Sequence, residues 1–235
     1  MRPDLFSSNV DFHGDLVRNI PGIRESQNLF DDLSSNSDDW EIAIAAEGVE
    51  RIPTTAALIT RPFDYGSVIS YSFDTVNWHE TRFSDGSTYG LWYGSLDTET
   101  TVYETAWHWF RFVRESFPDE NREIATDRRL FDVRCAALLV DVRGMENTYP
   151  DLVSRTSYAF SQQVGRYAFE QGLNGILVHS ARCDGTNGVV FKPERLSNVR
   201  DRMFLTYRMN VVRDTFVAEH TPGTEWLRCR PSVLA

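Results

Sequence analysis

Two stretches of the chain carry apolar side chains at the spacing of a helix with one buried face. In residues 98–117 an apolar residue recurs every three or four positions, which predicts an amphipathic helix. That stripe consists of Val102, Ala106, Trp109, Phe110, Val113 and Phe117. A second helix is predicted over Ser157–Gln171, and Gly172 stands where a helix commonly ends in a left-handed residue.

Shorter apolar runs before, between and after these helices predict strands. Alternation of apolar and polar residues and clusters of β-branched or aromatic residues are the signals used. The predicted strands are Ala56–Thr60, Ser67–Phe73, Tyr89–Leu96, Arg129–Val142, Gly175–His179, Gly188–Phe191 and a strand or strand pair over Met203–Val217. Helices and strands interleave without regular βαβ spacing, so we expect a mixed α/β (α+β) domain and not a doubly wound one.

Residues 1–54 differ from the rest in composition. They are polar and include an acidic stretch at Asp31–Asp39, and short helices are plausible over Gly22–Leu33 and Asp38–Val49. Pro53 closes the region. We therefore expect a helical N-terminal extension over residues 1–54 and a catalytic domain over residues 55–235.

Composition and charge narrow the function classes. The 235 residues are 41% hydrophobic and 13% aromatic, which is typical of a globular protein. The net charge is −10, so we expect no nucleic-acid binding by this chain. The three cysteines form no CxxC pair, and no apolar run is long enough for a signal peptide or a membrane span. These features predict a cytoplasmic protein that does not associate with membranes.

Common catalytic and metal motifs are missing. The sequence has no GxxxxGK[ST], GxGxxG, HExxH or GxSxG pattern, and His79-Glu80 is not followed by a second histidine at position 83. The five histidines show no spacing typical of metal ligands. We expect no metal.

Two blocks of sequence together resemble a known family. The first reads TRFSDGSTYGLWYGSLDTETTVYET over residues 81–105, and the second reads NGILVHSARCDGTNGVVFKP over residues 174–193. With LITRP at 58–62 and the helix segment SQQVGRYAFEQG, their order and spacing resemble the RES domain family over about residues 56–193. RES domains are bacterial toxins that act on NAD⁺ and are usually encoded beside an Xre-type antitoxin.

This resemblance implies an ADP-ribosyltransferase-like fold with NAD⁺ as substrate in a cleft between two small sheets. The functional residues of the family fall on Arg82, Tyr93, Glu104 and Ser180, and an earlier family arginine falls on Arg61. His179 departs from the family pattern, and the first 54 residues and the tail after about Val217 lie outside it.

The proposed chemistry requires these residue types. Cleavage of the nicotinamide–ribose bond passes through an oxocarbenium-like ribose, which a carboxylate such as Glu104 stabilises. Arginines such as Arg82 and Arg61 bind diphosphate, Tyr93 can stack on nicotinamide, and Ser180 can bond ribose or carboxamide. Each residue also has an ordinary structural interpretation. Glu104, for example, lies roughly opposite the apolar stripe of its helix and could be a solvated side chain.

The sequence leaves several outcomes open. The acceptor could be water, phosphate or a protein, which would make the chain an NAD⁺ glycohydrolase, a phosphorylase or an ADP-ribosyltransferase. The alternative is a catalytically weak domain that binds a partner through Asp31–Asp39 or the tail. We expect control by an Xre-type antitoxin or by export as an effector, and self-association into a homo-oligomer is compatible with the sequence.

Overall fold

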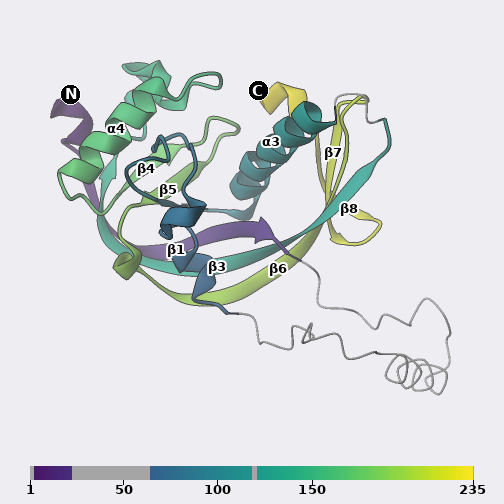
Figure 1. Cartoon of the computed structure of the whole chain (residues 1–235), viewed down its shortest axis with the longest axis horizontal. Coiled ribbons are helices and arrows are strands. Elements are labelled where there is room, and N and C mark those ends of the chain that lie inside the picture. The colour runs from purple at the N-terminus through teal and green to yellow at the C-terminus, as the bar shows by residue number, and fades with distance from the viewer. Residues whose placement is uncertain (1–2, 23–63, 118–120, 235) are drawn as a thin grey trace. The chain divides into compact units, whose positions relative to one another are not determined.

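A computed structural model describes residues 3–22, 64–117 and 121–234 of the chain (Figure 1). The helices and strands below belong to one compact unit, residues 1–22 with 65–235. Its helices are α2 (Ser67–Ser70), α3 (Thr98–Ser116) and α4 (Ala159–Glu170). Its strands are β1 (Asn9–Pro21), β2 (Trp92–Ser95), β3 (Ile124–Asp141), β4 (Gly175–His179), β5 (Thr186–Val190), β6 (Leu196–Asn210), β7 (Thr215–Thr221) and β8 (Thr224–Cys229). Short 3-10 helices lie between several of these elements and near both ends of the described residues.

The strands form one sheet in the order β1-β2-β5-β4-β3-β6-β7-β8, and β1 also pairs with β3. Strand β3 is long enough to pair with β1 along one edge and with both β6 and β4 along the other. The circuit β1-β2-β5-β4-β3 therefore closes on itself, joined at its narrowest point by the pair Val17–Ser95. The β3–β4 pair is parallel and the other named pairs are antiparallel, so the sheet is mixed.

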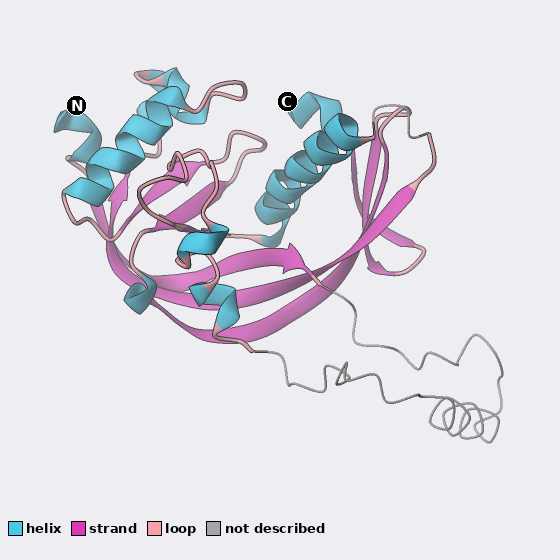
Figure 2. Ribbon diagram, viewed as in Figure 1, coloured by secondary structure: helices cyan, strands magenta, loops and turns pink. Residues whose placement is uncertain are grey.

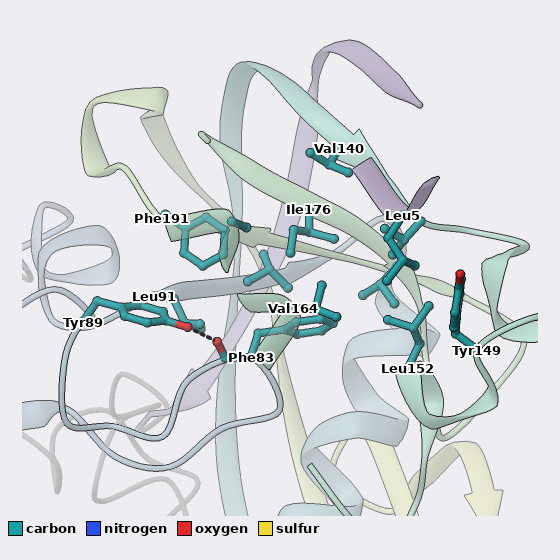
Figure 3. Packing of buried hydrophobic residues seen from close by; sticks show 14 residues of the cluster. Leu5, Phe83, Tyr89, Leu91, Val140, Tyr149, Leu152, Val164, Ile176 and Phe191 are labelled. Carbon is teal, nitrogen blue, oxygen red and sulfur yellow. Dashed lines mark hydrogen bonds between the residues drawn. The ribbon is translucent and has the colours of Figure 1, made fainter. Parts of the chain in front are cut away.

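Two hydrophobic clusters pack on this sheet, one around each long helix. Figure 2 shows where the two long helices lie on the curved sheet. Helix α3 buries Val102, Ala106 and Phe110 against residues of β3, β6 and β7. Helix α4 buries Val164 and Ala168 in a separate cluster with β4, β5 and the loop that precedes β2, and Figure 3 shows Val164 in this cluster.

The structure confirms a mixed α+β domain and both long helices. Helix α3 begins at the cap residue Asp97, whose side chain accepts a hydrogen bond from the Thr100 amide. Helix α4 is followed by Gly172 at φ 69°, the left-handed position predicted from sequence. Within the described residues, no helix has the length and apolar character needed to span a membrane.

Two sequence predictions are wrong. Residues 9–21 of the predicted helical extension form strand β1, which pairs with β3 along its whole length. Residues 67–73 were predicted as a strand but form helix α2 and turns, because their backbone bonds are local, as in Ser70 N–H to Gly66 O at 2.9 Å. The predicted helices Gly22–Leu33 and Asp38–Val49, strand Ala56–Thr60, the domain boundary near residue 54 and the Asp31–Asp39 stretch lie outside the described residues.

Candidate functional site

A cavity of about 910 Å³ opens between helix α3, strands β1 and β2, and two loops. The two loops are residues 79–82, which precede β2, and residues 155–158, which precede α4. Its polar lining residues include Arg18, Asn19, Thr81, Arg82, Tyr93, Ser95, Glu104, Thr105, His108, Arg111, Arg155, Tyr158 and Asn187. Three residues predicted from sequence, Arg82, Tyr93 and Glu104, therefore come together in one cavity.

The Glu104 carboxylate is held in place by one residue that follows β4 and one residue of β5. The Ser180 hydroxyl donates to Glu104 Oε1 at 2.6 Å, and the Asn187 amide donates to the same oxygen at 2.8 Å. Ser95 in turn donates to Asn187 Oδ1 at 2.7 Å, which fixes the orientation of the amide. Within the described residues Glu104 Oε2 has no hydrogen-bond partner, so one carboxylate oxygen is anchored and the other is available to a ligand.

Ser180 acts on Glu104 and is not itself a lining residue of the cavity. It lies just after β4, is 8% exposed, and its Oγ also accepts the backbone N–H groups of Arg182 and Cys183. These two donors leave the Ser180 hydroxyl oriented toward the carboxylate. The structure therefore places Ser180 behind Glu104 as its support.

Arg82 lies at the tip of a tight turn. Its Nη1 donates to the Ser154 carbonyl at 2.7 Å, and its guanidinium lies 4.9 Å from the centre of the Tyr158 ring. No carboxylate among the described residues pairs with it. The remaining N–H groups of the fork are thus free to bind an anion in the cavity.

Tyr93 supplies a buried hydroxyl at the same place. Burial raises the pKa of Tyr93 well above its usual value, and the nearby Arg82 charge opposes this rise. Its hydroxyl has no hydrogen-bond partner of ordinary geometry among the described residues. A buried polar group in this state favours a bound ligand with a donor or acceptor in reach.

Arg18 was missed by the sequence analysis, because it lies in the predicted extension. It comes from β1 and donates to the Tyr93 carbonyl at 2.8 Å and to Ser72 Oγ at 2.9 Å. Its Nε is buried without a partner in the described part of the chain, and burial lowers the pKa of Arg18 to about 10. A half-buried arginine without a carboxylate partner has lost part of its hydration, so an anionic ligand would stabilise it.

The cavity concentrates positive charge in an acidic protein. Arg18, Arg82, Arg111 and Arg155 line it against two glutamates, Glu80 and Glu104, although the whole chain carries a net charge of −10. Asn187 was also not predicted as a site residue, although it lies inside the GTNGVVF block. Arg61 lies outside the described residues. Over residues 3–22, 64–117 and 121–234, no group of three or more His, Cys, Asp and Glu side chains is placed to hold a metal ion.

Comparisons with known proteins give a family and similar solved structures. The family model described as RES domain matches residues 49–210, well over half of the chain. A crystal structure of the M. tuberculosis MbcT–MbcA toxin–antitoxin complex contains a chain with 12% sequence identity to this one. The match covers 87% of this chain and 88% of that chain, with a TM-score of 0.44. No curated protein matches the sequence.

Proposed function

Because the chain belongs to the RES domain family, we propose that it is a toxin that cleaves the nicotinamide–ribose bond of NAD⁺. The observation that supports this most is that Glu104, with one carboxylate oxygen anchored, lines the same cavity as two arginines. These are Arg18 and Arg82, which lack carboxylate partners in the described part of the chain. A volume of about 910 Å³ suits a dinucleotide in an ADP-ribosyltransferase-like cleft.

The residues divide the work of binding and catalysis. Arg18 and Arg82 bind the diphosphate, since a guanidinium donates two parallel hydrogen bonds to phosphate oxygens. Tyr93 contacts the nicotinamide ring or its carboxamide. Glu104 Oε2 accepts a hydrogen bond from a ribose hydroxyl, and Ser180 and Asn187 hold the carboxylate in place by their bonds to Oε1.

The bond that breaks joins the ribose anomeric carbon to the nicotinamide nitrogen. Its electron pair stays on that nitrogen, so nicotinamide leaves as a neutral molecule and needs no general acid. Positive charge develops on the ribose and is stabilised by the Glu104 carboxylate. Water or inorganic phosphate then bonds to the anomeric carbon, which yields ADP-ribose or its 1″-phosphate. Water gives up one proton to the solvent in this step.

Transfer of ADP-ribose to a protein side chain is the second outcome of the same intermediate. An antitoxin that covers the cavity is the expected partner, since a toxin that consumes NAD⁺ endangers the cell that makes it. A catalytically weak domain that serves mainly to bind a partner is the alternative.

The test is incubation of the purified chain with NAD⁺, with and without inorganic phosphate, and mass analysis of the ribosyl product. Free nicotinamide supports cleavage, ADP-ribose identifies water as acceptor, and a product heavier by one phosphate identifies phosphorolysis. Release of nicotinamide only when a protein substrate is added indicates the transferase. No nicotinamide from folded protein under any of these conditions contradicts the proposal.

A further inference from the structure

One face of helix α4 is occupied by the turn that carries Arg82. Four residues on this face, starting with the residue that precedes the helix, are spaced four, three and four positions apart, so they lie in one stripe. They are Tyr158, Gln162, Gly165 and Phe169. Each contacts a residue of the segment 80–90, named here the Arg82 loop.

Gln162 and Tyr158 contact the start of the turn and the side chain of Arg82. Gln162 Nε2 donates to the Thr81 carbonyl at 3.0 Å and to Glu80 Oε1 at 3.0 Å. The Tyr158 ring lies 4.9 Å from the Arg82 guanidinium. The turn itself is closed by the Thr81 N–H bond to the Ser84 carbonyl at 2.7 Å.

Gly165 and Phe169 contact the loop at Phe83 and at Tyr89. A Cβ at Gly165 would lie 2.0 Å from the Phe83 carbonyl oxygen, so only glycine lets the helix approach this closely. The Phe83 side chain is fully buried, and the Tyr89 hydroxyl donates to the same carbonyl (Figure 3). The Tyr89 ring stacks on Phe169 with 4.3 Å between ring centres.

We propose that this stripe of α4 is a splint that positions Arg82 for substrate, with Gln162 as its polar positioning residue. Phe83 is buried on one side of the turn while Arg82 points to the cavity on the other, so a shift of the turn moves the guanidinium. None of the four residues except Tyr158 lines the cavity. The inference rests on the proposed function for its kinetic consequence, but the splint itself is tested by a measurement that needs no activity.

The first measurement is amide hydrogen exchange in full-length protein. Gln162→Met keeps the length of the side chain and removes its donors, and Gln163→Met is the matched control because Gln163 is exposed and adjacent. We expect faster exchange over residues 81–84 in Gln162→Met alone, with β3 unchanged in both. Unchanged exchange over residues 81–84 in Gln162→Met overturns the splint, whether or not the chain cleaves NAD⁺.

The second measurement is kinetic. Loss of a single hydrogen bond that positions Arg82 is expected to raise KM for NAD⁺ about three- to tenfold in Gln162→Met, with a smaller change in kcat. In an Arg82→Met background the same change should have no further effect on kcat/KM, because the group it positions is gone. Equal fold-changes in both backgrounds would show that Gln162 acts through general stability.

Gly165→Ala is the stronger variant, since its methyl group must displace the Phe83 carbonyl. We expect a larger rise in KM than in Gln162→Met if circular dichroism shows a folded protein. An unfolded Gly165→Ala protein leaves the decision to Gln162→Met. Absence of nicotinamide release from wild-type protein contradicts the proposed function alone, because the exchange measurement still tests the splint.

Discussion

Glu104 offers the cavity a single carboxylate oxygen, because Ser180 and Asn187 both donate to the other. Glu104→Gln keeps an amide oxygen that accepts both bonds and removes the charge that we propose faces the ribose. We expect a folded protein whose rate of NAD⁺ cleavage falls about 10²–10³-fold, the usual loss for one preorganised electrostatic group. Nicotinamide release measures the rate, and Glu99→Gln, on the exposed face of α3, is the control. A Glu104→Gln enzyme with the normal rate would remove the catalytic assignment.

Arg18 gives a second prediction at the same scale. Arg18 is half-buried and has no carboxylate partner among the described residues, so the protein should gain stability when an anion binds there. We expect ADP-ribose to raise the melting temperature of the wild-type protein and of the control Arg114→Lys, whose arginine is exposed. Arg18→Lys loses the guanidinium fork that we propose binds phosphate oxygens, so its shift should be much smaller. Equal shifts in all three proteins would mean that the anion binds elsewhere.

The sequence identified some of these residues and not others for a physical reason. The helical period of α3 places Glu104 away from the apolar stripe, and that reading alone describes a solvated side chain. Its partners are Ser180, just after β4, and Asn187 in β5. Both lie about 80 positions later in the chain, so only the folded sheet brings them to Glu104. Arg18 has a weak local signal, since Val10, Phe12, Leu16 and Ile20 alternate as in a strand, but the polar residues between them obscured it.

At the scale of elements, the start of α3 depends on one cap. The Asp97 side chain accepts hydrogen bonds from the Thr100 amide and the Thr100 hydroxyl, both at 2.7 Å. Asp97→Ala should lower the free energy of unfolding by about 0.5–2 kcal/mol, and Asp97→Asn by less because it still accepts. Chemical denaturation checks both. NAD⁺ cleavage should persist in Asp97→Ala, because the packing of Val102 and Ala106 keeps the part of α3 that carries Glu104 in place. Equal loss of stability in both variants would argue against a cap.

Elements with a strong local signal were predicted well, and elements defined by partners were not. Helices α3 and α4 carry apolar stripes and end signals of their own. Residues 67–73 alternate like a strand, yet of these only Val68 is buried, and they pair with no strand of the described sheet. Period-2 alternation over a few residues therefore did not outweigh the local hydrogen bonds of a helical turn.

At the scale of the whole molecule, β1 makes the N-terminal segment part of the core. It pairs with β3 along thirteen residues, and Leu16 is fully buried against β2 and β5, where a Cβ at Gly188 would lie 2.7 Å from its side chain. Leu16→Ala should lower the free energy of unfolding by about 2–5 kcal/mol. His13→Ala, on an exposed position of the same strand, should change it by less than about 0.5 kcal/mol. A small loss for Leu16→Ala would make β1 an addition to the fold and not a member of its core.

The proposed activity also has a consequence for the cell that makes the protein. NAD⁺ cleavage without a restraining partner removes a cofactor that many reactions need, so expression of this chain alone should arrest growth and lower cellular NAD⁺. Both effects should disappear in Glu104→Gln and persist in Glu99→Gln, because only the first variant alters the carboxylate in the cavity. Timed measurements of cell density and NAD⁺ after induction check the order of events, and NAD⁺ should fall before growth stops.

The outcomes of that experiment distinguish NAD⁺ depletion from other causes of growth arrest and from the absence of toxicity. Arrest with normal NAD⁺ would indicate toxicity by transfer of ADP-ribose to a target protein or by another route. Unaffected growth with abundant folded protein and normal NAD⁺ would contradict the toxin proposal.

A partner that relieves the arrest should act at the cavity, where Arg18 and Arg82 attract an acidic group such as a carboxylate placed in the diphosphate position. The partner should therefore bind Arg18→Lys more weakly than wild type and should compete with ADP-ribose. A partner that binds wild type and Arg18→Lys equally, with or without ADP-ribose, would restrain the protein from another surface.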